Sequence, residues 1–158
     1  MIVVADAGPV LHLYWIGCLS WGLPPTTVHV VEQVWLEIER QAPDALQDAR
    51  LKWNVAPKPE PEWQARFSLD AGELSAIAFA FGHPGALLLT DDDAARRACS
   101  TLGIAAAGTI GLILEAARAK RVDVSAAVRA REELPTRGRL HISKDLLRVA
   151  IGALKGGA

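Results

Sequence analysis

Short apolar runs alternate along the chain with segments whose apolar residues recur at helical spacing. The runs predict buried strands at residues 1–5, 28–31, 86–90 and 104–106. The segments between them predict helices at 10–19, 32–41, 70–81, 91–103 and 109–120. Strands that are buried on both faces and separated by helices are typical of a mostly parallel sheet covered on both sides. We therefore expect an α/β fold with three layers, α/β/α, around a central mostly parallel sheet.

Polar residues predict where several of these helices begin. Asp70 followed by Glu73 three residues later is the pattern of a capping box. Thr109, Ser125 and Ser143 are each expected to cap a helix start. The last two indicate that residues 121–158 form a C-terminal helical extension of a single domain, 1–158.

Glycine and proline mark two departures from the regular alternation. Gly8-Pro9 is expected to turn the chain from the first strand into a helix that begins at Val10. Residues 42–67 are rich in proline, and we expect an irregular insertion with one short helix and an extended piece around 53–55.

The composition is typical of a globular protein. At 158 residues, with 51% apolar and 22% charged residues, the chain is the size of one globular domain. No Lys or Arg precedes the first apolar run and Asp6 interrupts it, so neither a signal peptide nor a membrane span is expected. Cys18 and Cys99 are far apart in the sequence and match no metal-ligand spacing, which favours a reducing cytoplasm.

Charge is distributed unevenly along the chain. Residues 1–93 carry 5 Lys and Arg against 13 Asp and Glu, whereas residues 94–158 carry 12 against 5. An acidic half and a basic half fit a metal-binding pocket beside a phosphate-contacting surface. The alternative is that solvated helix faces are uneven, and the asymmetry locates no site.

Carboxylates follow two of the predicted strands. Asp6 ends the first strand, and Asp91-Asp92-Asp93 follows the strand at 86–90. The carboxyl ends of parallel strands meet at one edge of a sheet, where functional crevices form. Three adjacent like charges repel, and a divalent cation would relieve them because hard cations prefer carboxylate oxygen. The alternative is a solvated corner stabilised by the dipole of the next helix.

Five short motifs in a fixed order carry a resemblance to a known family. They are VVADAGPVLHLYWIG at 3–17, VHVVEQVWLEI at 28–38, LDAGELSAIAFA at 69–80, LLLTDDDAARRACSTLGI at 87–104 and GTIGLIL at 108–114. Over residues 2–120 the chain resembles a PIN domain, the fold of VapC-type toxin ribonucleases, and within it an uncharacterised bacterial and archaeal branch. The resemblance implies a nuclease of PIN-like fold.

The resemblance implies a ring of acids around Mg²⁺ or Mn²⁺, which on this chain falls on Asp6, Glu37, Glu73 and either Asp91 or Asp92. Asp93 is the least expected ligand of its run. Many relatives have a hydroxyl shortly after the first Asp, whereas this chain has Ala7-Gly8, and we expect Thr90 to substitute.

The function implied by this resemblance is metal-dependent endoribonuclease activity, with RNA as substrate. It also implies the toxin of a type II toxin–antitoxin system, with a cognate antitoxin partner and a homodimer. Arg96 is a candidate to hold a phosphate. Later basic residues could contact the RNA backbone, namely Arg118, Lys120, Arg121, Arg137 and Arg139.

Two other function classes are weighed against the nuclease. A catalytically inactive PIN-fold module for RNA binding or protein interaction would have little use for carboxylates at all the acid positions. A receiver domain or aspartyl-phosphate phosphatase needs a lysine near the phosphoryl group, and no Lys lies between Lys58 and Lys120.

Overall fold

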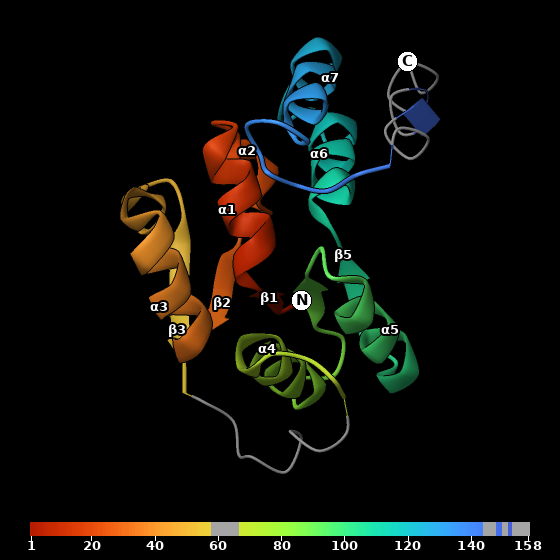
Figure 1. Ribbon diagram of the computed structural model, residues 1–158. Coiled ribbons are helices and arrows are strands. Elements are labelled where there is room, and N and C mark those ends of the chain that lie inside the picture. The colour runs from red at the N-terminus through yellow and green to blue at the C-terminus, as the bar shows by residue number, and fades with distance from the viewer. Residues whose placement is uncertain (58–66, 144–147, 150–151, 153–158) are drawn as a thin grey trace.

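The computed structural model describes residues 1–57, 67–143, 148–149 and 152. Its centre is a sheet of five parallel strands in the order β3-β2-β1-β4-β5 (Figure 1). The strands are β1 (Val3–Ala5), β2 (Thr27–Val31), β3 (Lys52–Ala56), β4 (Leu87–Leu89) and β5 (Ala105–Ala107). The extended piece expected around residues 53–55 is therefore an edge strand, paired with β2.

Helices cover both faces of the sheet. They are α1 (Ala7–Trp15), α2 (Leu19–Gly22), α3 (Glu32–Gln41), α4 (Ala71–Phe81), α5 (Asp93–Leu102), α6 (Thr109–Arg118) and α7 (Val124–Glu133), with a 3₁₀ turn η1 at Pro43–Gln47. Two apolar cores lie on opposite faces because side chains alternate along β1. Val3 and Ala5 join the core formed with α1, α3, α6 and α7, whereas Val4 joins the core formed with α4 and α5. The predicted three-layer fold is confirmed.

The first helix begins earlier than expected. It starts at Ala7 rather than Val10, so Gly8 and Pro9 lie inside its first turn. The first-turn N–H groups of a helix have no intrahelical acceptor, and the fixed φ of proline is already helical, so Pro9 costs little there. As a result Asp6 occupies the N-cap position, although its side chain makes no capping hydrogen bond.

Two predicted helix caps are also corrected. Gly108, not Thr109, is the N-cap of α6. Asp123, not Ser125, caps α7: its Oδ1 accepts from the Ala126 N–H at 2.8 Å and from the Ser125 hydroxyl at 2.5 Å. A carboxylate two residues upstream therefore takes the capping role expected of the serine.

The C-terminal segment is described only in part. Helix α7 lies within the expected helical extension, whereas the helix expected after Ser143 falls mostly outside the described residues. Within the part of the chain that is described, no helix combines the length and apolar character that crossing a membrane requires.

Candidate functional site

A cavity of about 300 Å³ opens at the carboxyl edge of the sheet. Six of its lining residues carry carboxylates, namely Asp6, Glu37, Asp70, Glu73, Asp91 and Asp92. The other lining residues are Ala7, Gly8, His12 and Leu140. The structure thus brings all five predicted acids to one cavity and adds Asp70 to them. Asp93 and Arg96 are exposed and do not line it.

The pairing of the two central strands explains why distant acids meet. Ala5, the last residue of β1, pairs with Leu89, the last residue of β4. The Asp6 N–H extends this ladder by donating to the Leu89 carbonyl at 2.9 Å. Asp6 therefore leaves the sheet at the same edge as Asp91 and Asp92.

Asp6 lies deepest among the acids, and its charge is poorly tolerated there. Burial raises the pKa of its carboxyl to about 7, opposed by a hydrogen bond from the Ala7 backbone. The neighbouring charges of Glu73, Asp70 and Glu37 raise that pKa further, in that order. A buried acid among like charges is the environment in which a bound cation would be most stabilising.

Asp70 and Glu73 serve the start of α4 as well as the cavity. The Glu73 N–H donates to Asp70 Oδ1 at 2.8 Å, and the Asp70 N–H donates to Glu73 Oε2 at 3.0 Å. The predicted capping box is confirmed. Burial is the main cause that raises the pKa of Glu73, and the charges of Asp70, Asp92 and Glu37 add to it. Capping and membership of the acidic cavity are therefore compatible.

Glu37 and Asp92 line the same cavity as Asp70 and Glu73. Glu37 is half-buried on α3, and its Oε1 accepts from Gln41 Nε2 at 3.0 Å. Asp92 caps α5 by accepting from the Ala95 N–H at 2.7 Å. The Asp92 N–H donates to Thr90 Oγ1 at 3.3 Å. The Thr90 hydroxyl thus supports Asp92 and not Asp6, contrary to expectation.

Asp91 is bound on both of its oxygens. The Thr109 N–H donates to Oδ1 at 2.7 Å, and the Thr109 hydroxyl donates to Oδ2 at 2.5 Å. Because an ionised carboxylate only accepts, His12 Nδ1 is the donor in its 2.9 Å bond to Oδ2. Asp91 therefore joins the end of β4 to α1 and α6.

Glycine at position 108 permits this close approach. A Cβ at Gly108 would lie 2.7 Å from Asp91 Oδ1 and 2.9 Å from Arg96 Nη1. The Arg96 guanidinium consequently rests beside the start of α6. Arg121 Nη1 donates to the carbonyls of Trp21 and Leu23, so this side chain joins the start of the segment after α6 to the end of α2.

The donor chemistry of the cavity fits a hard divalent cation. Four acids each keep one carboxylate oxygen without a hydrogen bond to any described residue: Glu37, Asp70, Glu73 and Asp92. Magnesium and manganese prefer such oxygens. Within the described residues, however, no three His, Cys, Asp or Glu side chains are grouped as a formed metal site. Binding would require these side chains to rotate toward one another.

Three residues of the site were not singled out by the sequence for roles in it. The sequence assigned Asp70 to a capping box and Thr109 to the start of its own helix, and it gave His12 no role. The signal for Asp70 was its position three residues before Glu73, which places both carboxylates at one helix start. His12 and Thr109 carried no signal, because both act through a contact with Asp91 across the sheet edge.

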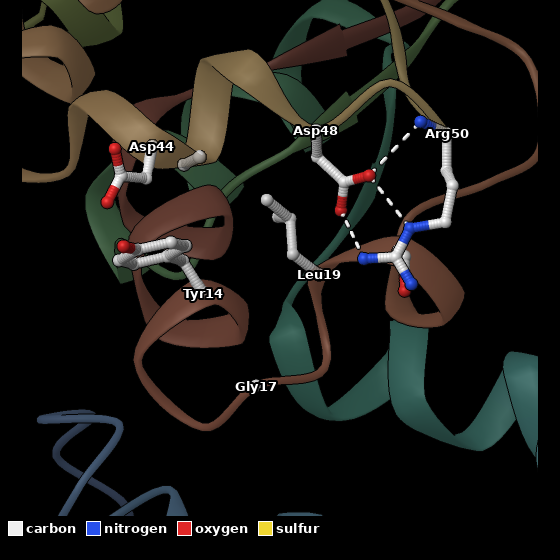
Figure 2. Close-up of a pocket in the computed structure, with 8 residues that line it drawn as sticks. Tyr14, Gly17, Leu19, Asp44, Asp48 and Arg50 are labelled. Carbon is white, nitrogen blue, oxygen red and sulfur yellow. Dashed lines mark hydrogen bonds and ion pairs between the residues drawn. The ribbon is translucent and has the colours of Figure 1, made fainter.

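A second pocket, of about 160 Å³, lies between α1, α2 and η1 and is lined by residues that include Tyr14, Leu19 and Asp44. Figure 2 shows its Asp48 carboxylate directed at the Arg50 guanidinium. Arg50 Nε and Nη2 donate to Asp48 at 2.8 and 2.7 Å, and these bonds lower the pKa of Asp48. The Asp48 and Arg50 charges therefore neutralise each other, and Asp44 is the remaining charged side chain in the lining.

A protein-family model and a solved structure match this chain. The PIN-domain family DUF3368 matches residues 2–155, a span that contains every residue lining the acidic cavity. Among solved structures, a PilT N-terminus domain protein from the hyperthermophilic archaeon Sulfolobus solfataricus P2 is similar. It is 16% identical, with a TM-score of 0.49, over 73% of this chain and 93% of that chain. No curated protein matches.

Proposed function

The chain belongs to the PIN-domain family, and from this premise we propose that it is a metal-dependent endoribonuclease that hydrolyses RNA phosphodiester bonds. PIN domains are generally nucleases. The observation that supports the proposal for this chain is the cavity in which Asp6, Glu37, Glu73 and Asp92 converge at the edge of the sheet. Glu73 and Asp92 also cap helices, whereas the Asp6 side chain caps none. A shared cation would offset the charge that the four segments bring together.

Mg²⁺ or Mn²⁺ would be held by Asp6, Glu37, Glu73 and Asp92, with Asp70 beside them. When bound, such an ion supplies Lewis-acid chemistry, lowering the pKa of water and offsetting negative charge on phosphoryl oxygens. The carboxylates themselves would repel an RNA strand, so the cation also makes the cavity accessible to a polyanion. Asp6, the most buried acid, sets the depth at which the cation is held.

The hydrogen bonds favour Asp92 over Asp91 as a ligand. Both oxygens of Asp91 already accept bonds from Thr109 and His12, whereas Asp92 has one oxygen to spare. The charge of Asp92 also raises the pKa of Glu73, after burial and the charge of Asp70. We assign to Asp91 the role of a positioning residue that fixes α1 and α6 around the cavity.

Cleavage of a fluorescent RNA in Mn²⁺ tests the nuclease. The wild type is expected to cut, and Asp6→Asn and Asp92→Asn to fall to the no-enzyme background. Asp91→Asn should retain activity reduced about 10–100-fold, as for residues that orient ligands. The matched control is Asp93→Asn, which removes the same charge from an exposed acid outside the cavity and should cut like the wild type.

The same assay contains the outcome that favours the alternative. If the wild type binds RNA but never cuts it in Mg²⁺ or Mn²⁺, the chain is a catalytically inactive PIN-fold module. If Asp6→Asn cuts as well as the wild type, the acidic cavity is not the active site.

The toxin role is a further part of the proposal, supported by the resemblance to VapC-type ribonucleases. It places the protein in the cytoplasm, as a homodimer neutralised by a cognate antitoxin. Induced expression of the wild type in bacteria should then arrest growth, whereas Asp6→Asn at equal abundance should not. Growth arrest by both proteins would separate toxicity from the acidic cavity.

A further inference from the structure

The segment that follows α7 turns back and passes in front of α6 in the view of Figure 1. The Gly138 N–H donates to the Glu133 carbonyl at 3.0 Å, and the Leu140 N–H donates to the Leu134 carbonyl at 2.9 Å. A Cβ at Gly138 would lie 2.8 Å from Leu134 Cα, so glycine is required where the chain passes the end of α7. This turn places Leu140 in the cavity lining.

Arg139 stands next to Leu140 and packs on α1. Its guanidinium carbon lies 4.6 Å from the centre of the Trp15 ring, a distance at which a cation is attracted to an indole face. Trp15 is one turn after His12 on α1, and the two rings are 6.2 Å apart. His12 in turn lines the cavity and bonds Asp91. A continuous path of side chains therefore leads from the acids to Arg139.

Arg137 and Arg139 differ in how many of their guanidinium donors already make hydrogen bonds. Arg137 Nη1 donates to Glu133 at 2.6 Å, and its Nη2 donates to the Trp15 carbonyl at 3.4 Å. Arg139 is exposed, and among the described residues its guanidinium has no hydrogen bond or ion pair. Stacking on Trp15 uses the face of the guanidinium and leaves its in-plane N–H donors accessible.

The backbone at Arg139 makes an arginine there costly. Its φ is 55°, in the left-handed region that glycine adopts freely and other residues adopt at a cost of about 1–2 kcal/mol. The contact with Trp15 offsets part of this cost.

We propose that Arg139, held in place by Trp15, binds a backbone phosphate of the single-stranded nucleic acid that enters the acidic cavity. The proposal deepens the nuclease function and rests on it for the identity of the strand. A planar guanidinium matches the two oxygens of a phosphate. Aromatic and cationic side chains together are typical of single-strand sites. A cation here also offsets the repulsion between the acids and an approaching phosphate.

Binding is measured apart from cleavage. A fluorescein-labelled single-stranded RNA is titrated with protein in Ca²⁺, a hard cation that offsets the charge of the acids, at several NaCl concentrations, and a gel confirms that the strand stays intact. Arg139→Gln is expected to weaken binding about tenfold, as for loss of one charge-assisted hydrogen-bonded contact. It should also lower the slope of log K against log salt by about 0.7, because one phosphate contact is lost.

Two further variants separate this site from general charge. Arg139→Lys keeps the charge, so the salt slope should remain while affinity falls, because a lysine cannot make the bidentate contact. Arg118→Gln removes the same charge from an arginine that was also expected to contact the RNA backbone. Arg118 is exposed in a separate hollow with Lys120 and Arg121, so on this proposal its loss should change affinity less than twofold.

Each contrary result has a definite meaning. Equal affinity and slope for Arg139→Gln and the wild type overturn the proposal, as does an equal loss for Arg118→Gln or failure of the wild type to bind RNA. If instead an acidic peptide binds in an Arg139-dependent way and RNA does not, the surface is a protein contact and the proposal fails. Mn²⁺-dependent cleavage that is lost in Asp6→Asn but unaffected by Arg139→Gln would preserve the nuclease while removing this site.

Discussion

Adjacent acids at the end of β4 have different environments although they differ by one position in the chain. Asp91 turns toward Thr109 and His12 and is saturated by hydrogen bonds. Asp92 turns toward Glu73 and caps α5. Successive side chains on an extended backbone point to opposite sides, which accounts for the separation. Position in a run of acids therefore decides which of the two side chains keeps a carboxylate oxygen free of hydrogen bonds.

The pH dependence of stability is expected to report on Asp6. Its pKa is about 7 in the folded protein against 3.8 as the ordinary value, so between these values the folded state holds a proton that the unfolded state has lost. Wild-type stability should therefore fall as pH rises from about 4 to 7, by at most about 4 kcal/mol from this group. Asp6→Asn should remove that part of the fall.

Urea unfolding in EDTA at pH 5 and pH 8 measures the difference. Asp93→Asn is the matched control, because it replaces an exposed acid outside the cavity and should leave the pH dependence of the wild type unchanged. A fall of the same size in Asp6→Asn would show that Asp6 is not the buried, proton-binding acid.

Helix α6 illustrates how one element is fitted to the site. Its first residue, Thr109, binds Asp91 through both its N–H and its hydroxyl. The hydroxyl that the sequence predicted as a cap is used across the sheet edge instead. The helix start therefore fixes a side chain of the cavity, and Gly108 must remain small for the two to meet.

Two glycine substitutions on either side of this helix start should have opposite effects. Gly108→Ala places a Cβ 2.7 Å from Asp91 Oδ1, so Asp91 must shift and the protein should lose about 1–3 kcal/mol of stability. Gly111→Ala, in the same helix, meets nothing within 4 Å and should gain up to about 1 kcal/mol from helix propensity. Chemical denaturation measures both, and destabilisation by both would contradict the steric explanation.

Across the whole molecule, strand order concentrates acidic side chains. β1 lies at the centre of the sheet, between β2 and β4, so the chain leaving it is flanked by the segments that continue into α3 and α5. The side chains that reach this point are mostly acids; burial is the main cause that raises the pKa of Asp6 and of Glu73, and the repulsion among the acids adds to it. The free energy lost to this repulsion is available to a cation.

Thermal unfolding should show whether cation binding in the cavity stabilises the fold. If the cavity binds Mn²⁺, saturating Mn²⁺ at 100 times Kd adds about 2.7 kcal/mol, which for a domain of this size raises Tm by roughly 5–11 °C. Asp6→Asn should remove most of the shift, and Na⁺ at matched ionic strength controls for screening. A shift that is the same in Asp6→Asn would place the binding elsewhere.

The pattern of apolar runs and helical stripes was enough to predict the layers, the parallel sheet and the acids at its edge. These follow from local periodicity and from burial, which each segment carries in its own residues. The start of α1 was predicted three residues late because Gly8-Pro9 is compatible with both a turn and a first helical turn.

What only the tertiary structure decided are the contacts between segments that are distant in the sequence. Asp91 could be distinguished from Asp92 only once Thr109 and His12 were seen beside it, and Arg139 from Arg137 only once Trp15 was. Local sequence determines which residues leave a strand at the site edge. Packing alone determines which partner each side chain then meets, because hydrogen bonds and charges act over a few ångströms in space, whatever the separation in the sequence.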